Sequence, residues 1–298
     1  MLSQIRALRE FYKYLKSNNF YDYNVLMYSV HPILSIPIFM LRKRFRFTVS
    51  TICSEIPQFR AAGNKISVFS KIKLYLQKLE NRMFDRYILF ADAMKDVIPV
   101  GKKPYTVIEG IAPDYNCETL TSKRNIVMYA GGLGAQNNIE LLMDACNATE
   151  AVEELWICGS GGNVDDIKAR SKGKIKYLGN LSPEEIMPLE QKAKLLVNLR
   201  NPDLEITRFA FPSKILEYMS SGTAVLSTNL EGIPKEYHSY ISVLEDLSIV
   251  SVKAAIEKIL MTDEKEYSEL CEKARKFVLE KKCAVFQAAQ ILDFCTKH

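Results

Sequence analysis

The sequence has few of the residues that build metal centres and disulfide frameworks. Its 298 residues include only three His and one Trp, and none of its seven Cys belongs to a C-x-x-C pair. A structural zinc site is therefore not expected, because such sites use closely spaced pairs of Cys and His ligands. The odd, scattered cysteines indicate reduced and mostly buried thiols in a cytosolic protein.

Glycine and proline are too scarce for a fibrous or low-complexity chain. The sequence has 13 Gly and 11 Pro, with 48% hydrophobic and 25% charged residues. These proportions are typical of a packed globular protein and exclude intrinsic disorder as the main state. The length allows one large domain or two of about 150 residues.

A long apolar run is also missing. The longest apolar stretch, residues 25–41, is interrupted by Pro32 and Pro37 and is followed by a basic cluster at 42–46. A membrane-spanning helix needs about 20 apolar residues, so we interpret this stretch as a buried strand, a turn and a short helix. The charged, amphipathic N-terminus has no apolar core of a signal peptide, which favours a cytoplasmic location.

The charges are unevenly distributed along the chain. Residues 1–110 contain 18 Lys and Arg against 8 Asp and Glu, a net charge of +10, whereas residues 111–298 carry −5. A basic segment favours an anionic partner such as a membrane surface, a phosphate group or nucleic acid. The alternative is a basic face that only contacts water. Nucleic acid is disfavoured because no recognised nucleic-acid motif accompanies the charge.

Hydrophobic patterning predicts alternating strands and helices in two regions. In the first region, strands are predicted at 24–30, 45–52, 87–90 and 105–108, with helices at 3–16, 32–41 and 66–82 and a helical turn at 91–98. In the second, strands are predicted at 125–130, 154–158, 174–178, 195–199, 224–227 and 241–244, with helices at 138–146, 164–171, 183–192 and 213–220 and a helical tail from 248. This alternation predicts an α/β fold with doubly wound parallel sheets. Gly110 and Pro113 interrupt the pattern and indicate a linker near 109–117.

Two glycine-rich loops follow predicted strands of the second region. One contains Gly131, Gly132 and Gly134, and the other is the run Gly159-Ser160-Gly161-Gly162. Ligands of open parallel sheets gather at the carboxyl ends of the strands, where glycine backbone can approach a phosphate closely. Each loop taken singly could instead be a tight turn that needs glycine.

The strongest candidate for a binding site is RFAFPSKILEYMSSG at residues 208–222. Pro212 suits the first helical position, which places Ser213 and Lys214 in the first turn. A lysine there opposes the helix dipole unless an anion is nearby, so this end of the helix favours a diphosphate. Glu217, one turn deeper on the same face, could accept hydrogen bonds from both hydroxyls of a ribose. A capping or surface carboxylate is the alternative for Glu217.

The second region resembles the nucleotide-binding half of the GT-B glycosyltransferases, especially the retaining family 4 type. The matching segments are YAGGLGAQNNIELLMDA (129–145), LWICGSGG (155–162), IKYLGNLSPEEI (175–186), FPSKILEYMSSGTAVLST (211–228) and EGIPKEY (231–237). Upstream, TICSEIPQ (51–58), FDRYILFADAMKDVI (84–98) and YTVIEGIAPDY (105–115) resemble the later part of that fold's first domain. The resemblance covers most of the chain.

The resemblance implies an α/β fold of two Rossmann-like domains facing a cleft. Residues 1–112 would form a shortened N-terminal, acceptor-side domain, 113–262 the nucleotide-sugar domain, and 263–298 helices that pack back toward the N-terminal domain. The implied activity is transfer of a sugar, with retention, from a UDP- or GDP-linked donor. The acceptor would be a glycan or a lipid-linked molecule in cell-surface polysaccharide or glycolipid synthesis. The enzyme would then be peripheral on the cytoplasmic face of an anionic membrane.

The resemblance also assigns residues. Glu217 matches the glutamate that holds the ribose, Ser213 and Lys214 lie beside the diphosphate, and Gly131 and Gly132 form the loop near it. Gly179 and Leu181 match the segment that lines the base, and Ser160 belongs to the second glycine loop as a further nucleotide-binding residue.

Several positions depart from the family pattern. Phe209 lies eight residues before Glu217, where the family often has a glutamate that touches the donor sugar. Gly132 and Asn137 replace an Arg and a Lys of the first glycine loop, so Arg208 and Lys214 are the candidate catalytic residues that carry the phosphate charge. No metal cofactor is expected, because the sequence has no Asp-x-Asp triplet and Lys214 can neutralise the leaving diphosphate. A degenerate, non-catalytic nucleotide-binding protein or partner subunit remains the alternative.

Overall fold

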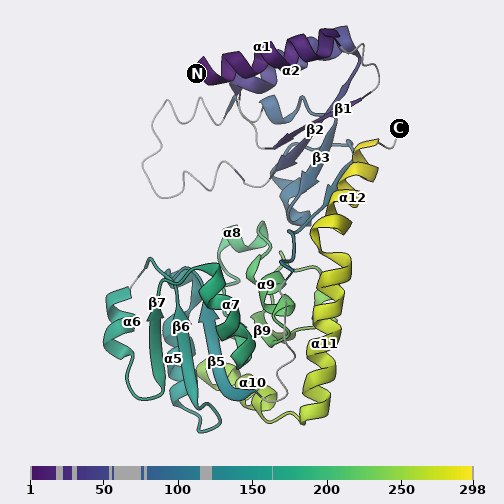
Figure 1. The fold of residues 1–298 in the computed structure, drawn as a ribbon. Coiled ribbons are helices and arrows are strands. Elements are labelled where there is room, and N and C mark those ends of the chain that lie inside the picture. The colour runs from purple at the N-terminus through teal and green to yellow at the C-terminus, as the bar shows by residue number, and fades with distance from the viewer. Residues whose placement is uncertain are drawn as a thin grey trace. The chain divides into compact units, whose positions relative to one another are not determined.

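The computed structural model describes residues 2–17, 23–28, 32–53, 56, 75–76, 79–114, 123–162 and 164–296. The chain divides into two compact units (Figure 1). Unit 1 comprises Met1–Glu109 together with Ala288–His298, and unit 2 comprises Gly110–Gln287. Most of the helix predicted at 66–82 lies outside the described residues, as does Cys117.

Unit 1 contains a four-stranded parallel sheet in the order β1-β2-β3-β4. Its strands are β1 (Asn24–Tyr28), β2 (Thr48–Cys53), β3 (Arg86–Leu89) and β4 (Tyr105–Val107), and its other elements are α1 (Leu2–Ser17), α2 (Pro32–Phe45) and the 3-10 helix η1 (Asp92–Asp96). The strands predicted for this region are confirmed, but the start of the second was wrong. Residue 45 is the last residue of α2 and is not part of a strand, and Arg46, directly after the helix, has the left-handed conformation at φ 51°.

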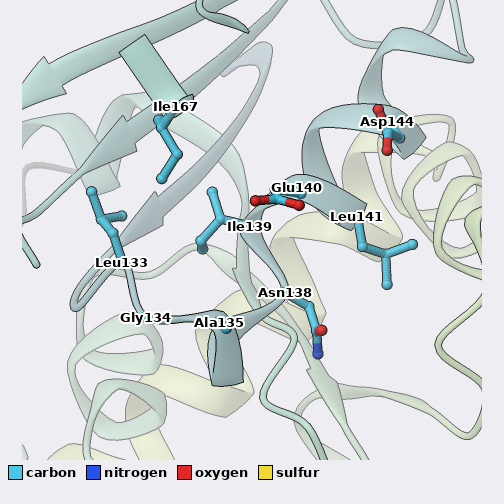
Figure 2. Close-up of a pocket in the computed structure, with 9 residues that line it drawn as sticks. All are labelled: Leu133, Gly134, Ala135, Asn138, Ile139, Glu140, Leu141, Asp144 and Ile167. Carbon is cyan, nitrogen blue, oxygen red and sulfur yellow. The ribbon is translucent and has the colours of Figure 1, made fainter. Parts of the chain in front are cut away.

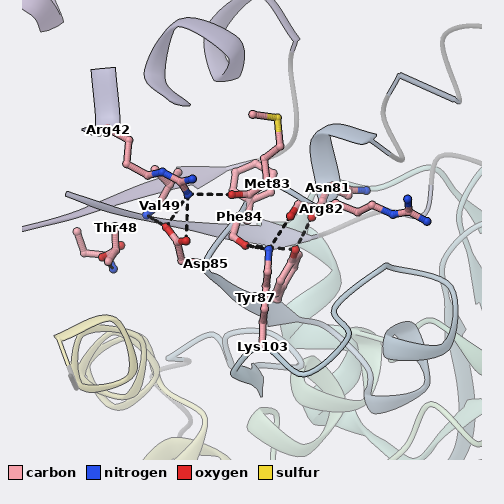
Figure 3. A network of polar contacts seen from close by, with 11 residues as sticks. Arg42, Thr48, Val49, Asn81, Arg82, Met83, Phe84, Asp85, Tyr87 and Lys103 are labelled. Carbon is pink, nitrogen blue, oxygen red and sulfur yellow. Dashed lines mark hydrogen bonds and ion pairs between the residues drawn. The ribbon is translucent and has the colours of Figure 1, made fainter. Parts of the chain in front are cut away.

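A polar network ties α2 to this sheet (Figure 3). The Arg42 guanidinium Nη1 donates to the two carboxylate oxygens of Asp85 at 3.0 and 3.1 Å and to the carbonyl of Met83 at 3.1 Å. The same carboxylate accepts the Val49 backbone N–H at 2.9 Å. One cation of the basic cluster at 42–46 is therefore a structural group of unit 1.

The end of α12 (Ala284–Thr296) belongs to unit 1. Cys295 is buried with Ile88 and Ile108, and the backbone carbonyl of Cys295 accepts hydrogen bonds from Asn24 and Arg86. Apolar burial and two hydrogen bonds, one of them charge-assisted, thus fix the C-terminal helix to a sheet built from the first third of the chain.

Unit 2 contains a six-stranded parallel sheet in the order β10-β9-β8-β5-β6-β7. The strands are β5 (Arg124–Ala130), β6 (Glu154–Cys158), β7 (Ile175–Gly179), β8 (Ala193–Asn198), β9 (Ala224–Thr228) and β10 (Ser242–Leu244). The helices are η2 (Ala135–Asn137), α5 (Ile139–Asn147), α6 (Val164–Arg170), α7 (Pro183–Lys192), α8 (Glu205–Arg208), α9 (Lys214–Ser220), η3 (Lys235–Ser239), α10 (Ile249–Leu260) and α11 (Glu264–Lys281). Every strand and helix predicted in the second region is present within a few residues, whereas the four-residue α8 was not predicted.

Helices cover both faces of this sheet, because successive side chains of a strand point to opposite faces. On β5, Val127 and Tyr129 join a core cluster that includes residues of α5 and α10. The intervening Ile126, Met128 and Ala130 join a second cluster with residues of α9 and α11. Full burial of a large apolar side chain contributes about 1.5–3 kcal/mol, so both faces stabilise the unit. The predicted α/β class with a doubly wound parallel sheet is confirmed.

Among the residues that the structure describes, no helix is both long enough and apolar enough to cross a membrane.

Candidate active site

The two glycine loops lie side by side at the carboxyl edge of the unit 2 sheet. They follow β5 and β6, which are paired in parallel. The Gly131 N–H donates to the Cys158 carbonyl at 2.9 Å, and the Leu133 N–H donates to the Ser160 carbonyl at 3.0 Å. A side-chain carbon added at Gly159 would meet the Gly131 carbonyl oxygen at 1.7 Å. The two loops therefore pack backbone against backbone, which only glycine permits at Gly159.

The second loop also joins the end of β7. The Gly159 N–H donates to the Gly179 carbonyl at 2.8 Å, and Gly179 has a positive φ of 91°. Gly162 approaches the Leu133 carbonyl so closely that an added carbon would lie 1.9 Å from its oxygen. The Ser160 side chain is exposed. The predicted nucleotide-binding positions on three strands are thus connected through backbone hydrogen bonds and close packing.

Gly132 is fixed through its carbonyl oxygen. The Tyr129 hydroxyl and the Asn137 side-chain amide each donate to this oxygen at 2.7 Å. Leu181 is half-buried and packs against the core cluster beneath α9. These contacts hold the first glycine loop and the predicted base-lining segment in place.

Lys214 lies directly over the first glycine loop. It is the first residue of α9, after the exposed Ser213, whose backbone is already helical at φ −52° and ψ −25°. The Ile215 N–H donates to the Pro212 carbonyl at 2.9 Å, so the first turn begins near the predicted residue. A carbon added at Gly131 would lie 2.5 Å from the Lys214 Cε. The predicted glycine and lysine are therefore in contact, although they are more than 80 positions apart in the sequence.

Glu217 lies one turn further along α9 on the same side as Lys214. Its carboxylate Oε2 is 3.9 Å from the Lys214 Nζ, and the two side chains are 24% and 29% exposed, respectively. This separation is longer than a hydrogen bond, so both groups keep bonding capacity for a ligand. Beneath them, the buried Tyr218 hydroxyl bonds the backbone N–H and carbonyl of Ala130 at 3.1 Å each, which joins α9 to the end of β5.

Arg208 has a protein partner in this structure. Its Nε lies 2.9 Å from both carboxylate oxygens of Glu231, and its guanidinium lies 5.3 Å from the centre of the Phe209 ring. The role of Arg208 in catalysis stays a prediction, and the ion pair with Glu231 must loosen for the guanidinium to reach a diphosphate.

Glu190 is a buried carboxyl group near these residues that the sequence analysis missed. It lies on α7 with 0% exposure, and both its oxygens have no hydrogen-bond partner among the described residues. Burial and, to a smaller extent, the nearby charge of Glu217 raise the pKa of Glu190 to about 8, although Lys214 lowers it. A neutral carboxyl group therefore lies next to Lys214 and Glu217 at neutral pH.

A pocket of about 310 Å³ lies beside the first glycine loop (Figure 2). It is lined by Leu133, Gly134, Ala135, Asn138, Ile139, Glu140, Leu141, Asp144 and Ile167. None of the predicted donor-binding residues lines it. Among the described residues, no three His, Cys, Asp or Glu side chains gather closely enough to hold a metal ion. The expectation of a metal-independent reaction stays a prediction.

Comparison with known proteins places this geometry in context. Residues 124–261 match the family described as Glycosyl transferases group 1. A search among curated proteins finds no match. Many solved structures are similar to the chain, and three of them illustrate the relationship.

The similar structures share the fold at low sequence identity. Anabaena HepE, in complex with UDP and glucose, superposes with a TM-score of 0.65 at 15% identity, covering 94% of this chain and 79% of HepE. An E. coli structure, described as trehalose-6-phosphate bound with UDP-2-fluoro glucose, superposes with a TM-score of 0.65 at 10% identity. The match covers 99% of this chain and 78% of the E. coli chain. A mutant of S. aureus TarM in complex with fondaparinux, alpha-GlcNAc-glycerol and UDP superposes with a TM-score of 0.64 at 15% identity. The match covers 91% of this chain and 55% of TarM.

The family match covers the part of the chain that carries the candidate site. The matched residues span the sheet from β5 to β10 and include the two glycine loops and α9. The similarity in fold extends beyond them, over more than nine-tenths of the chain. Residues 124–261 therefore match the group 1 glycosyl transferases, and the chain as a whole has the α/β fold of the GT-B glycosyltransferases.

Proposed function

We propose that this protein transfers a sugar from a UDP-sugar to a glycan or lipid-linked acceptor. The observation that carries the proposal is the contact between Lys214 and the first glycine loop, with Glu217 3.9 Å from the lysine ammonium. A cation, a close-packed glycine backbone and a carboxylate one helical turn away match the needs of a diphosphate joined to a ribose.

Each group has a separate task in donor binding. Glu217 accepts hydrogen bonds from the ribose hydroxyls, because an ionised carboxylate has only acceptors. Lys214 and the glycine loop hold the diphosphate, and Ser213 and Ser160 offer exposed hydroxyls at the same edge of the sheet. Gly179 and Leu181 line the base.

The proposed chemistry breaks the bond between the anomeric carbon and the diphosphate. Negative charge grows on the diphosphate as this bond breaks, so Lys214 binds the transition state more strongly than the ground state. The acceptor hydroxyl attacks from the face that the diphosphate leaves and gives its proton to the departing diphosphate oxygen, which retains the anomeric configuration. The choice of UDP over GDP rests on the similar solved structures, three of which contain UDP or a UDP-sugar analogue.

The proposed acceptor is glycan or lipid-linked, and the proposed place of action is an anionic membrane surface. The surface of α2 supports the membrane part of this proposal. The exposed fractions of Ile36 and Met40 are 51% and 75%, and the exposed Arg44 lies four residues further along the same side of the helix. An apolar stripe that ends in a cation can insert into the headgroup region, and each basic residue near an anionic bilayer contributes about 1 kcal/mol.

A non-catalytic nucleotide-binding protein is the second candidate. Phe209 is buried at 5% exposure and has no carboxylate to offer the donor sugar. This candidate predicts that UDP binds but that no UDP-sugar is turned over.

The proposed function is tested by incubating the protein with a panel of UDP- and GDP-sugars and measuring release of the nucleoside diphosphate, with and without glycan acceptors. We expect release of UDP from at least one UDP-sugar and its loss in Glu217→Ala. Binding of UDP without any release would favour the non-catalytic candidate. Absence of both binding and release would contradict the proposal.

A further inference from the structure

Arg200 is a half-buried cation at the carboxyl end of β8. Its Nε is enclosed by protein, and no hydrogen bond or ion pair joins its guanidinium to any residue that the structure describes. Burial lowers the pKa of Arg200, although an arginine still keeps its charge at neutral pH. A cation that is partly withdrawn from water and has a buried N–H without an acceptor is less stable than a paired one, so an anion from outside the protein is the natural partner for this group.

The backbone of Arg200 is attached to the first glycine loop on both sides. The side-chain amide of Asn138 donates to the Leu199 carbonyl at 2.8 Å, and the Asn201 N–H donates to the Gln136 carbonyl at 2.8 Å. Gln136 belongs to η2, which continues the first glycine loop. Residues 199–201 therefore cannot move away from that loop without losing two hydrogen bonds.

The Tyr129 hydroxyl connects Arg200 with Lys214. A carbon added at Gly131 would lie 2.8 Å from this hydroxyl and 2.5 Å from the Lys214 Cε, so tyrosine and lysine approach the same point of the loop. Burial raises the pKa of Tyr129, and the nearby positive charge of Arg200 opposes that rise. The Lys214 side chain and the charge of Arg200 thus both lie in the neighbourhood of Tyr129.

We propose that Arg200 and Lys214 together bind the diphosphate of the nucleotide, with Arg200 as the second cation of the site. This inference rests on the proposed function. A nucleoside diphosphate carries more negative charge than one lysine neutralises, and the planar guanidinium can donate two parallel hydrogen bonds to phosphate oxygens. Arg208, by contrast, already holds the carboxylate of Glu231.

The test compares Arg200→Gln and Arg200→Lys with the matched control Arg124→Gln. Arg124 is an exposed arginine at the opposite, amino end of β5, paired with Glu153 and Glu154. The affinity of each protein for UDP, uridine and inorganic pyrophosphate is measured by calorimetry. We expect Arg200→Gln to bind UDP and pyrophosphate about tenfold more weakly or worse, as loss of a charge-assisted hydrogen bond implies. Uridine binding stays unchanged, Arg200→Lys recovers part of the loss, and the control matches the wild type.

The outcomes separate this inference from the proposed function. Wild-type affinity for UDP and pyrophosphate in Arg200→Gln would overturn the inference. An equal loss for uridine would also overturn it, because Arg200 would then act on the structure of the whole site. If the wild type binds pyrophosphate through Arg200 but neither UDP nor uridine, the anion site stands and the proposed donor is wrong.

Discussion

Glu217 and Lys214 lie 3.9 Å apart on one helix but have different partners in the proposed complex. Replacing Glu217 with Ala removes acceptors for the ribose hydroxyls while leaving the diphosphate contacts in place. We expect UDP binding to weaken by about 1.5–3 kcal/mol, the range for hydrogen bonds to a charged group. Calorimetry checks this value, with circular dichroism to verify folding. Unchanged UDP affinity in a folded variant would remove Glu217 from the ribose site.

Gly131 and Gly159 respond differently to the same substitution. In Gly131→Ala, the added carbon meets the flexible end of Lys214 at 2.5 Å and the Tyr129 hydroxyl at 2.8 Å, so we expect a folded protein in which both side chains are displaced and UDP affinity falls at least severalfold. In Gly159→Ala, the carbon meets a backbone oxygen at 1.7 Å at a φ of 140°, so we expect a loss of roughly 2 kcal/mol or more in stability.

Thermal unfolding and UDP titration separate the two glycine variants. A Gly131→Ala protein with normal UDP affinity would contradict the contact between the lysine and the bound diphosphate. A Gly159→Ala protein as stable as the wild type would contradict the close packing of the two loops.

Glu190 makes the stability of unit 2 depend on pH. The pKa of its buried carboxyl is raised from 4.5 to about 8 in the folded state, so the folded state binds more protons than the unfolded state between these values. The free energy of unfolding therefore falls as pH rises from about 4.5 to about 8 and levels off above. Glu190→Gln has no carboxyl to ionise and therefore does not lose this stability. Because one pKa unit corresponds to about 1.4 kcal/mol, we expect the free energy of unfolding of the variant to exceed that of the wild type by about 2 kcal/mol or more at pH 9.

Denaturant unfolding of Glu190→Gln and the wild type at pH 5, 7 and 9 measures this difference. The advantage of the variant must grow with pH. An advantage that is constant or shrinks with pH would show that the Glu190 carboxyl is already ionised at neutral pH.

Local sequence identified only part of the candidate site. Lys214 and Glu217 could be predicted because a proline marks the start of their helix and the helical period then places both residues on one side of it. The glycine loops could be predicted because clusters of glycine at the ends of strands are visible within one short segment. Arg200 and Glu190 could not be singled out, because their significance is that buried polar atoms of each have no hydrogen-bond partner among the residues that the structure describes. Arg200 does lie two residues after the end of a fully buried strand, which is the local signal for its position.

At the scale of elements, one carboxylate joins α2 to two strands of the unit 1 sheet. Asp85 accepts hydrogen bonds from Arg42 and from the Val49 N–H, so Asp85→Ala removes the acidic partner of a half-buried cation and the acceptor of a backbone donor. We expect a stability loss of about 1–3 kcal/mol in unit 1. Thermal unfolding measures it, and unchanged UDP affinity is the control because the nucleotide site is built from unit 2. Unaltered unfolding would show that other contacts hold α2.

The boundaries of elements were predictable where hydrophobic patterning is strong. They were not predictable where the conformation of a single residue sets the end of the element. The buried strands β5 to β9 appear in the sequence as short apolar runs between polar turns. The end of α2 depends on Arg46, whose left-handed conformation is unusual for a residue with a side chain and has no sequence signature. Likewise, the four residues of α8 are too few to show a helical period.

At the scale of the whole molecule, the basic surface predicts salt-sensitive membrane association. We expect the wild type to bind anionic liposomes, with binding that falls steeply between low and physiological salt. Arg44→Gln combined with Arg46→Gln should weaken binding by about 1 kcal/mol per residue. Arg42 is left in place because it holds α2 through Asp85. A unit 2 variant with Arg124→Gln and Arg170→Gln is the matched control. A wild type that ignores anionic liposomes at low salt would instead favour a soluble acceptor.

The central claim is that Lys214 stabilises the diphosphate as it leaves the sugar. Its most direct test is the kinetics of Lys214→Ala with the UDP-sugar that the wild type uses. Because charge on the diphosphate is greatest in the transition state, kcat should fall about 100-fold or more while KM changes much less. A variant whose kcat is unchanged and whose KM alone rises would contradict the account.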